Sequence, residues 1–291
     1  MARKLITMPT TPFFSSSTFT LNRAVGQTIS PFTGQQKTQE YDFVGWSASL
    51  TLPPQLRSTA VNWQSFLARL NGTTNVFFMS DPDAKTPKGT YDSDFFETVN
   101  RVADTSTTLT FSASNKTITS NESIFGSAMV GDFIFVTGAT NEENNGTKRV
   151  TATTSATVLT VEDTLVDESS TASCKVQQNV KGSTGLSLKS SSNTGAGTIA
   201  VGDYLQIGQN NLSSHKQYVL VTQVSDEVAV SGGQNTYAVR IEPKLRSDIA
   251  ADTIVQFSNA QGLFRLMDNP VEWSAGRNSL YNISFSVAEV I

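Results

Sequence analysis

The sequence predicts an all-β protein with one packed helix and a small inserted β-barrel domain. Three observations support this prediction. Ser and Thr together number 72 against 46 charged residues, several segments alternate apolar and polar side chains, and only one segment has helical periodicity. With 291 residues, of which 38% are hydrophobic, the chain can bury one large or two medium cores.

Two segments, residues 46–52 and 281–287, alternate with the two-residue period of a half-buried strand. Shorter strands are expected where β-branched and aromatic residues lie between turn formers, at residues 76–79, 133–136, 218–221 and 237–241. Residues 183–198 are rich in Ser and Gly and predict a flexible loop.

One helix is expected to begin at Ser58, whose hydroxyl is a suitable N-cap, and to end at the left-handed stop Asn71-Gly72. Its apolar stripe has the helical spacing i, i+3, i+4, i+7 and consists of Ala60, Trp63, Phe66, Leu67 and Leu70. This stripe predicts packing against a sheet. The apolar contexts of Trp46, Trp63 and Trp273 likewise predict three buried tryptophans.

Composition separates the middle of the chain from its flanks. All nine prolines and all three tryptophans lie outside residues 101–180, and this segment alone carries the net charge of −4. We therefore expect 101–180 to be an inserted small β domain, around which residues 1–100 and 181–291 fold together as one discontinuous domain. Its predicted core is Leu109, Phe111, Ile118, Phe125, Phe133, Phe135, Val150, Leu159 and Val161.

A weak repeat occurs at an offset of 71 residues. Val130-Gly131-Asp132 and the following aromatic and aliphatic residues match Val201-Gly202-Asp203 and its successors, and Val150-Thr151 matches Val221-Thr222. The shared pattern predicts a glycine turn that leads into a strand. Recurrent hairpin chemistry and true duplication both explain it.

No residue set predicts catalysis, a cofactor or a metal site. His215, the one histidine, lies in a polar loop and is expected at the surface, and Cys174, the one cysteine, is expected to be a half-buried structural thiol. The acidic residues Asp81, Asp83, Asp92 and Asp94 have the closest spacing to a cation site, but prolines and lysines among them favour a structured turn.

Several functional classes are disfavoured. Glycoside hydrolysis would need two carboxylates at a set separation, and residues 195–197 lack the third glycine of a dinucleotide fingerprint. The net charge of −4 argues against sequence-specific nucleic-acid binding through a basic face. Prolines interrupt the apolar residues near the start and no 18-residue apolar run occurs, so neither a signal peptide nor membrane insertion is expected.

An ordered set of segments resembles the distal tail proteins of tailed bacteriophages, which are tail-tip or baseplate-hub proteins. The resemblance covers roughly residues 10–100 and 181–291 and leaves 101–180 outside it. Before the middle segment it rests on Ser30-Pro31-Phe32-Thr33-Gly34-Gln35-Gln36, Leu52-Pro53-Pro54, Trp63, Phe66-Leu67, Leu70-Asn71-Gly72 and the run from Asp81 to Pro87-Lys88-Gly89. After it, the matching segments are residues 201–208, 241–246, 262–266 and 283–290.

The resemblance implies a virion structural protein with a tail-tube-like β-sandwich or split barrel. Such proteins form a ring, usually a homohexamer, which joins the tail tube to hub or fibre proteins around the DNA channel. We therefore expect a non-enzymatic protein of the virion tail tip that is assembled in the bacterial cytoplasm. The alternative from another class is a carbohydrate-binding β-domain that acts in host attachment, which would need exposed aromatic platforms.

Overall fold

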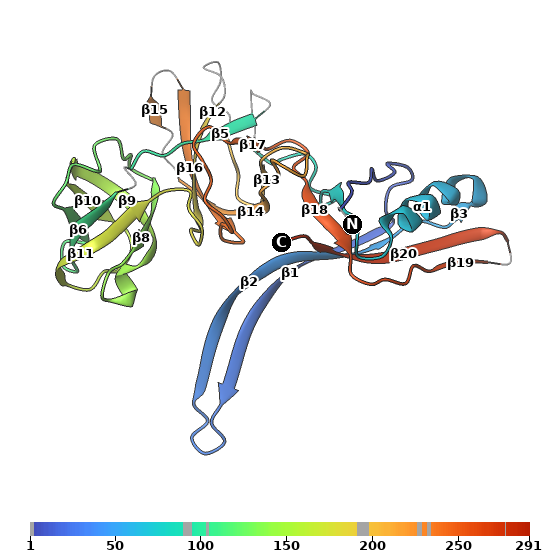
Figure 1. Ribbon diagram of the computed structural model, residues 1–291, viewed down its shortest axis with the longest axis horizontal. Coiled ribbons are helices and arrows are strands. Elements are labelled where there is room, and N and C mark those ends of the chain that lie inside the picture. The colour runs from blue at the N-terminus through green and yellow to red at the C-terminus, as the bar shows by residue number, and fades with distance from the viewer. Residues whose placement is uncertain are drawn as a thin grey trace. The chain divides into compact units, whose positions relative to one another are not determined.

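In the part of the chain that the structure describes, the protein is all-β, with one α-helix and a small closed barrel (Figure 1). The computed structural model describes residues 3–89, 95–102, 105–190, 198–225, 229–231, 234–276 and 278–291. The chain divides into two compact units. The first contains Met1–Lys85, Asn210–Ser213 and Gln261–Ile291, and the second contains the remaining residues, 86–209 and 214–260.

The first unit is built on an antiparallel sheet with the order β1-β2-β20-β18-β4. Two short strands, β3 and β19, extend it by pairing with β20. The bounds are β1 Ser16–Ile29, β2 Gln36–Thr51, β3 Gln55–Leu56, β4 Phe77–Met79, β18 Gly262–Leu266, β19 Trp273–Ala275 and β20 Leu280–Glu289.

Helix α1 (Arg57–Leu70) buries all five residues of its predicted apolar stripe. It ends at Asn71, which is left-handed (φ 51°, ψ 56°), as the Asn-Gly stop predicts. The prediction of its start was wrong, because Leu56 is the N-cap and makes no side-chain cap hydrogen bond. The short strand β3 runs directly into the helix, so Ser58 already lies inside the first turn.

Trp63 fastens the helix to the sheet and is only 1% exposed. Its ring lies 5.5 Å from Phe14, 5.8 Å from Phe66 and 6.1 Å from Phe285 of β20, measured between ring centroids. Its indole Nε1 donates a hydrogen bond of 3.2 Å to the carbonyl of Thr11. The predicted burial of Trp63 and Trp46 is confirmed.

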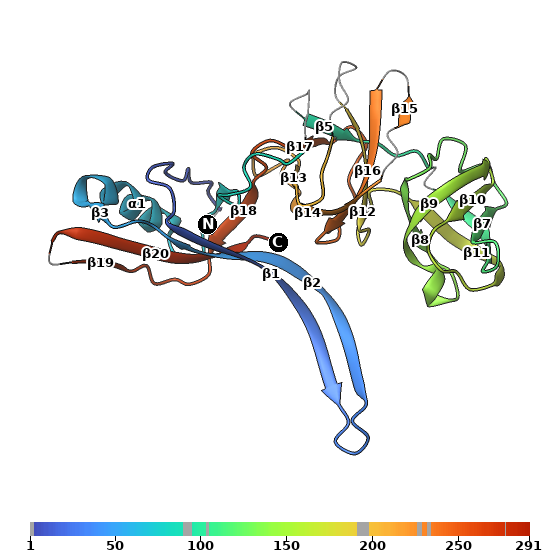
Figure 2. The same ribbon diagram turned by 180° about the vertical axis from the view of Figure 1, so that it is seen from behind.

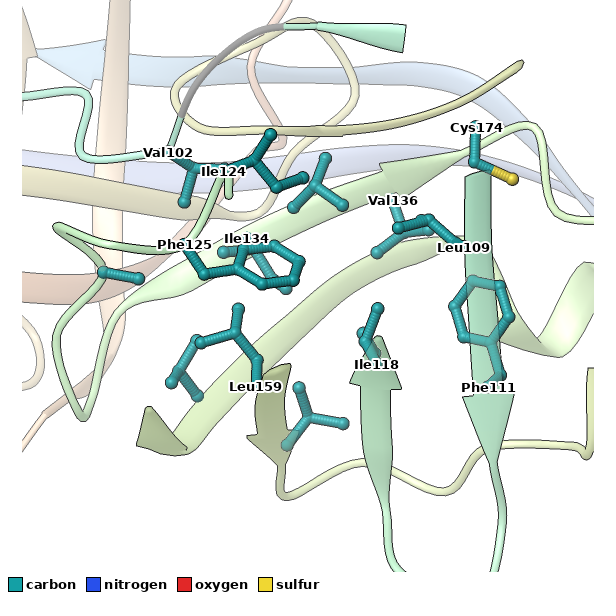
Figure 3. Close-up of a cluster of buried hydrophobic side chains, with 14 of the residues drawn as sticks. Val102, Leu109, Phe111, Ile118, Ile124, Phe125, Ile134, Val136, Leu159 and Cys174 are labelled. Atoms are coloured by element: carbon teal, nitrogen blue, oxygen red, sulfur yellow. The ribbon is translucent and has the colours of Figure 1, made fainter. Parts of the chain in front are cut away.

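The second unit contains a closed six-stranded barrel with the order β10-β7-β6-β11-β8-β9. Its strands are β6 Ser106–Ser112, β7 Thr117–Ser120, β8 Phe133–Thr137, β9 Gly146–Ser155, β10 Val158–Val161 and β11 Glu168–Gln177, and a short 3-10 helix, η1, covers Glu142–Asn144. Figure 3 shows its core, where aliphatic side chains surround Phe111 and Phe125.

Seven of the nine residues predicted for this core belong to it, but Phe133 and Phe135 do not. Ile134 and Val136 point inward instead, since neighbouring residues of a strand face opposite sides. Phe133 lies outside the barrel, where Arg240 stacks over its ring at 5.3 Å. A Cβ added at Gly185 would meet the Cβ of Phe133 at 2.1 Å, so the neighbouring strand must have glycine there.

The other strands of this unit also form a ring, because β12 pairs with both β5 and β16. They are β5 Phe95–Thr98, β12 Gly185–Ser190, β13 Tyr204–Ile207, β14 Gln217–Val224, β16 Gln234–Glu242 and β17 Ile254–Gln256, and β15 (Ala229–Ser231) pairs with β16. The loop prediction for 183–198 was therefore wrong for β12, whose Leu186 and Leu188 are buried; residues 191–197 lie outside the described residues.

The two rings have the same strand order. If the strands of each ring are numbered one to six along the chain, both run 2-1-6-3-4-5, and all pairings are antiparallel. The sequence repeat has the same register in each, with Phe133 opposite Arg149 in one ring and Tyr204 opposite Leu220 in the other. This correspondence favours duplication over recurrent turn chemistry.

The observed division of the chain differs from the predicted one. We expected residues 1–100 and 181–291 to fold together around 101–180, whereas the flanks contribute to two different compact units. The flanks thus form two cores. The first lies between α1 and the open sheet, and the second fills the second ring. The barrel strands, Ser106 to Gln177, lie within the segment predicted to be inserted and between the first and second strands of that ring.

Residues 101–180 are expected to fold in isolation, because the segment contains all six barrel strands and their own core. The excised segment should give dispersed amide signals in a ¹H–¹⁵N NMR spectrum. A collapsed random-coil spectrum would contradict this expectation.

Replacing Trp63 with Ala should lower the free energy of unfolding by about 3–5 kcal/mol, because it leaves a cavity between α1 and the sheet. Chemical denaturation of the two proteins measures the difference. Val61 lies on the same helix and is 45% exposed. Val61→Ala is therefore the matched control and should change the free energy of unfolding little. A loss below about 1 kcal/mol for Trp63→Ala would show that the helix is peripheral.

Candidate interaction surface

Strands β1 and β2 continue past the sheet as a two-stranded arm. Strand β20 pairs with β2 only at residues 47–51, and among the described residues the rest of β2 pairs with β1 alone. Figure 2 shows this hairpin leaving the sheet as a long curved ribbon. Where the arm begins, the carboxylate of Glu289 accepts a hydrogen bond of 3.1 Å from the backbone N–H of Trp46.

The arm contains a bulge. The register changes from Arg23 opposite Val44 to Val25 opposite Glu40, so three residues of β2 oppose one of β1. Just past the bulge, the ring of Tyr41 covers Gly26, where an added Cβ would lie 3.2 Å from its Cε2 atom. An aromatic ring over a strand glycine compensates for the missing side chain.

The turn at the end of the arm is held by its own hydrogen bonds. Ser30 N donates to the carbonyl of Gln35 at 2.8 Å, Gly34 N donates to the carbonyl of Ser30 at 2.9 Å, and Thr33 N donates to the Ser30 hydroxyl at 3.3 Å. Gly34 has φ of 69°, a left-handed conformation that favours glycine. The turn therefore presents Phe32 in a preset geometry, with its side chain 95% exposed.

Other large apolar side chains of the arm are also more than half exposed. They come from both strands and are Val25, Ile29, Tyr41 and Phe43. Exposed apolar residues that gather on one element mark an interaction surface, and strand edges without partners invite pairing with another chain. Sequence reasoning missed this surface; the only signal was a long segment of strand-forming residues in which apolar positions are sparse.

The acidic cluster forms the predicted turn where it is described. The carboxylate of Asp81 accepts a hydrogen bond of 3.3 Å from Asp83 N, and its carbonyl accepts one of 3.1 Å from Ala84 N. Asp92 and Asp94 lie outside the described residues. In the described part of the chain, no group of three or more His, Cys, Asp or Glu side chains is placed to hold a metal ion.

His215 is half-buried, whereas the sequence predicted a surface side chain. Burial, together with the nearby guanidinium of Arg246, lowers the pKa of His215 from 6.5 to about 4. Gln217 fixes this region, because its side chain accepts a hydrogen bond from Arg246 N at 3.0 Å and donates one to the carbonyl of Lys244 at 2.9 Å. The imidazole is therefore neutral at pH 7.

Cys174 is fully buried in the barrel core, deeper than the half-buried position predicted (Figure 3). Burial, with a contribution from the charge of Glu168, raises the pKa of its thiol. A buried, protonated thiol is a structural residue.

Trp273 contradicts the prediction of three buried tryptophans. It lies in β19 at the edge of the sheet, opposite Ile283, and is 45% exposed. Strand β19 has only three residues and all of them are exposed, so the apolar context of Trp273 in the sequence does not place it in the core.

Comparison with protein-family models and with curated proteins gives no match. Among the described residues, no helix has the length and apolar character needed to cross a membrane.

Stability should fall as the pH is lowered from 7 to 5, in part through His215. The unfolded chain takes up a proton near pH 6.5 and the folded chain only near 4, so the unfolded state binds more protons in this window. We expect His215→Gln to remove about 1–2 kcal/mol of this pH dependence. Urea unfolding of both proteins at pH 7, 6 and 5 measures it, and identical pH profiles would show that the histidine is solvated in the folded state.

Proposed function

We propose that this protein is a structural component of a bacteriophage tail tip, where it forms a ring that joins the tail tube to the host-recognition apparatus. Two things support the proposal. The flanking sequence resembles distal tail proteins. The arm also exposes large apolar side chains that a partner could cover.

The arm is the observation on which the proposal rests. A two-stranded hairpin is marginally stable alone in water, and this one exposes five large apolar side chains. Residues 21–46, 26 in all, lie beyond the part of β2 that pairs with β20, a number within the roughly 20–30 residues per side of a stable protein interface. Such an element would be stabilised by a partner that pairs with its strand edges and covers its apolar side chains.

In a ring, each arm reaches a neighbouring copy. We expect a homohexamer, as the resemblance implies, with tail-tube and hub or fibre proteins on its two faces. The acidic segment 101–180 is expected to project outward, because six copies of a −4 segment repel one another within a Debye length of about 8 Å. No enzymatic step is part of this function.

The alternative is a carbohydrate-binding protein that acts in host attachment. One observation favours it: Trp273 is 45% exposed, and exposed tryptophan rings stack on sugars. Trp273→Ala separates the two hypotheses. It should abolish retention on host glycans if the alternative holds and leave ring formation intact.

Removal of the arm should abolish the ring and leave the fold. Arg23 and Val44 already pair, so residues 24–43 can be replaced by Asn-Gly, which forms a two-residue hairpin turn. We expect a folded protein that phage tails fail to incorporate, because the surface that contacts the neighbour is missing.

Electron microscopy of tails assembled with either protein is the measurement, because a ring templated by the tail tube can be monomeric in solution. The wild-type chain should form the terminal ring. A tail that lacks the wild-type chain at its tip, or a normal ring built from the shortened protein, would contradict the proposal. Tape-measure and hub genes beside the gene would give independent support.

A further inference from the structure

The first unit contains an open cavity of about 630 Å³ against its sheet. Residues 49–51 of β2 and 284–286 of β20 form the floor, and the segment from Asp268 to Glu272 forms a wall. A volume of this size lies in the range of binding pockets. The cavity combines apolar side chains with carboxylates and hydroxyls.

The floor is built by cross-strand pairs. Ser49 lies opposite Ser286, with their hydroxyl oxygens 3.2 Å apart, and Thr51 lies opposite Ser284. The wall supplies apolar surface from Pro270 and Val271 and two exposed carboxylates, Asp268 and Glu272. An occupant that suits this lining has an apolar group and a nearby cation.

The tip of the arm has these two features. Phe32 is the most exposed of the large apolar side chains described in the chain, at 95%, and its turn is held rigid by the hydrogen bonds of Ser30. Lys37, which lies opposite Thr28 just behind the turn, is the charged residue nearest to the tip in the sequence. A rigid protruding side chain loses little conformational entropy on binding.

The tip cannot reach the cavity of its own chain. Strand β2 runs without interruption from Gln36 at the tip to Ser49 on the cavity floor. Thirteen residues of extended strand separate the two ends by roughly 40 Å. The tip and the cavity therefore lie far apart on one continuous strand, so a contact between them would have to be head-to-tail, between two copies.

We propose that the arm tip of one copy inserts Phe32 into the cavity of a second copy, with Lys37 facing Asp268 and Glu272. This contact rests on the proposed function, since it requires that copies assemble, but it names the surface that receives the arm. A head-to-tail contact of this kind closes into a ring when the rotation per copy allows it.

Disulfide trapping tests the contact. Thr33→Cys places a thiol beside Phe32 without removing it, and Val271→Cys places one in the cavity wall. The native Cys174 is fully buried and does not compete. Under mild oxidation, the double variant assembled in tails should give a ladder of linked chains, and a mixture of the two single variants should give linked dimers. Mass spectrometry should identify a disulfide between residues 33 and 271.

A matched control uses Val201→Cys in place of Val271→Cys. Val201 is exposed and lies outside the cavity, so its cysteine should form no disulfide with residue 33.

Charge reversal adds a second measurement. Lys37→Glu should lower the yield of the 33–271 disulfide about three- to fivefold, the effect of an exposed ion pair, and Glu272→Lys in the same chain should restore it.

The outcomes separate this contact from the proposed function. Rings seen by electron microscopy that give no 33–271 disulfide overturn the contact and leave the ring. A disulfide from residue 33 to a different tail protein also overturns it. Tails without any ring of this chain, and without the disulfide, overturn both proposals.

Discussion

The second unit depends on one kind of contact, a buried carboxylate that follows a left-handed glycine. Asp203 accepts hydrogen bonds from the backbone N–H groups of Lys88, Gly89 and Ala200, at 2.6, 3.2 and 2.7 Å. Asp132 accepts one from Met129 N and pairs with the buried guanidinium of Arg101. In both rings the aspartate thus holds the chain that leads into the first strand. Without it, partly buried backbone donors would lose their acceptors.

This hydrogen bonding of Asp203 joins two turns that lie far apart in the sequence. The Pro87-Lys88-Gly89 turn and the Val201-Gly202-Asp203 turn are more than 100 residues apart, yet the second supplies the acceptor for the first. An added Cβ at Gly89 would meet the carbonyl oxygen of Thr198 at 1.9 Å. Only glycine lets the two backbones approach so closely.

Periodicity predicted the all-β class, the helical stripe and most barrel core residues, because these depend on which residues repeat along one element. It could not predict whether Phe133 or Ile134 points inward, since both are apolar. The outer face of β8 is also buried, because it packs against the second ring. It also could not predict the exposure of Trp273, which depends on a three-residue edge strand. The arm was not predicted, because its residues are typical of strands and strand propensity does not show whether a further strand or sheet covers them.

In the proposed ring, the arm would also determine how assembly proceeds. Because its two strands lack a third strand to pair with among the described residues, part of the free energy of any contact it makes is spent on ordering the arm itself. In the proposed ring, binding of the first copies would then be weak. A surface that already orders the arms, such as the end of a tail tube, would remove this cost for each added copy. Under this proposal the chain would stay dispersed while it is free and assemble where the template is, which would keep its exposed apolar edges from pairing at random.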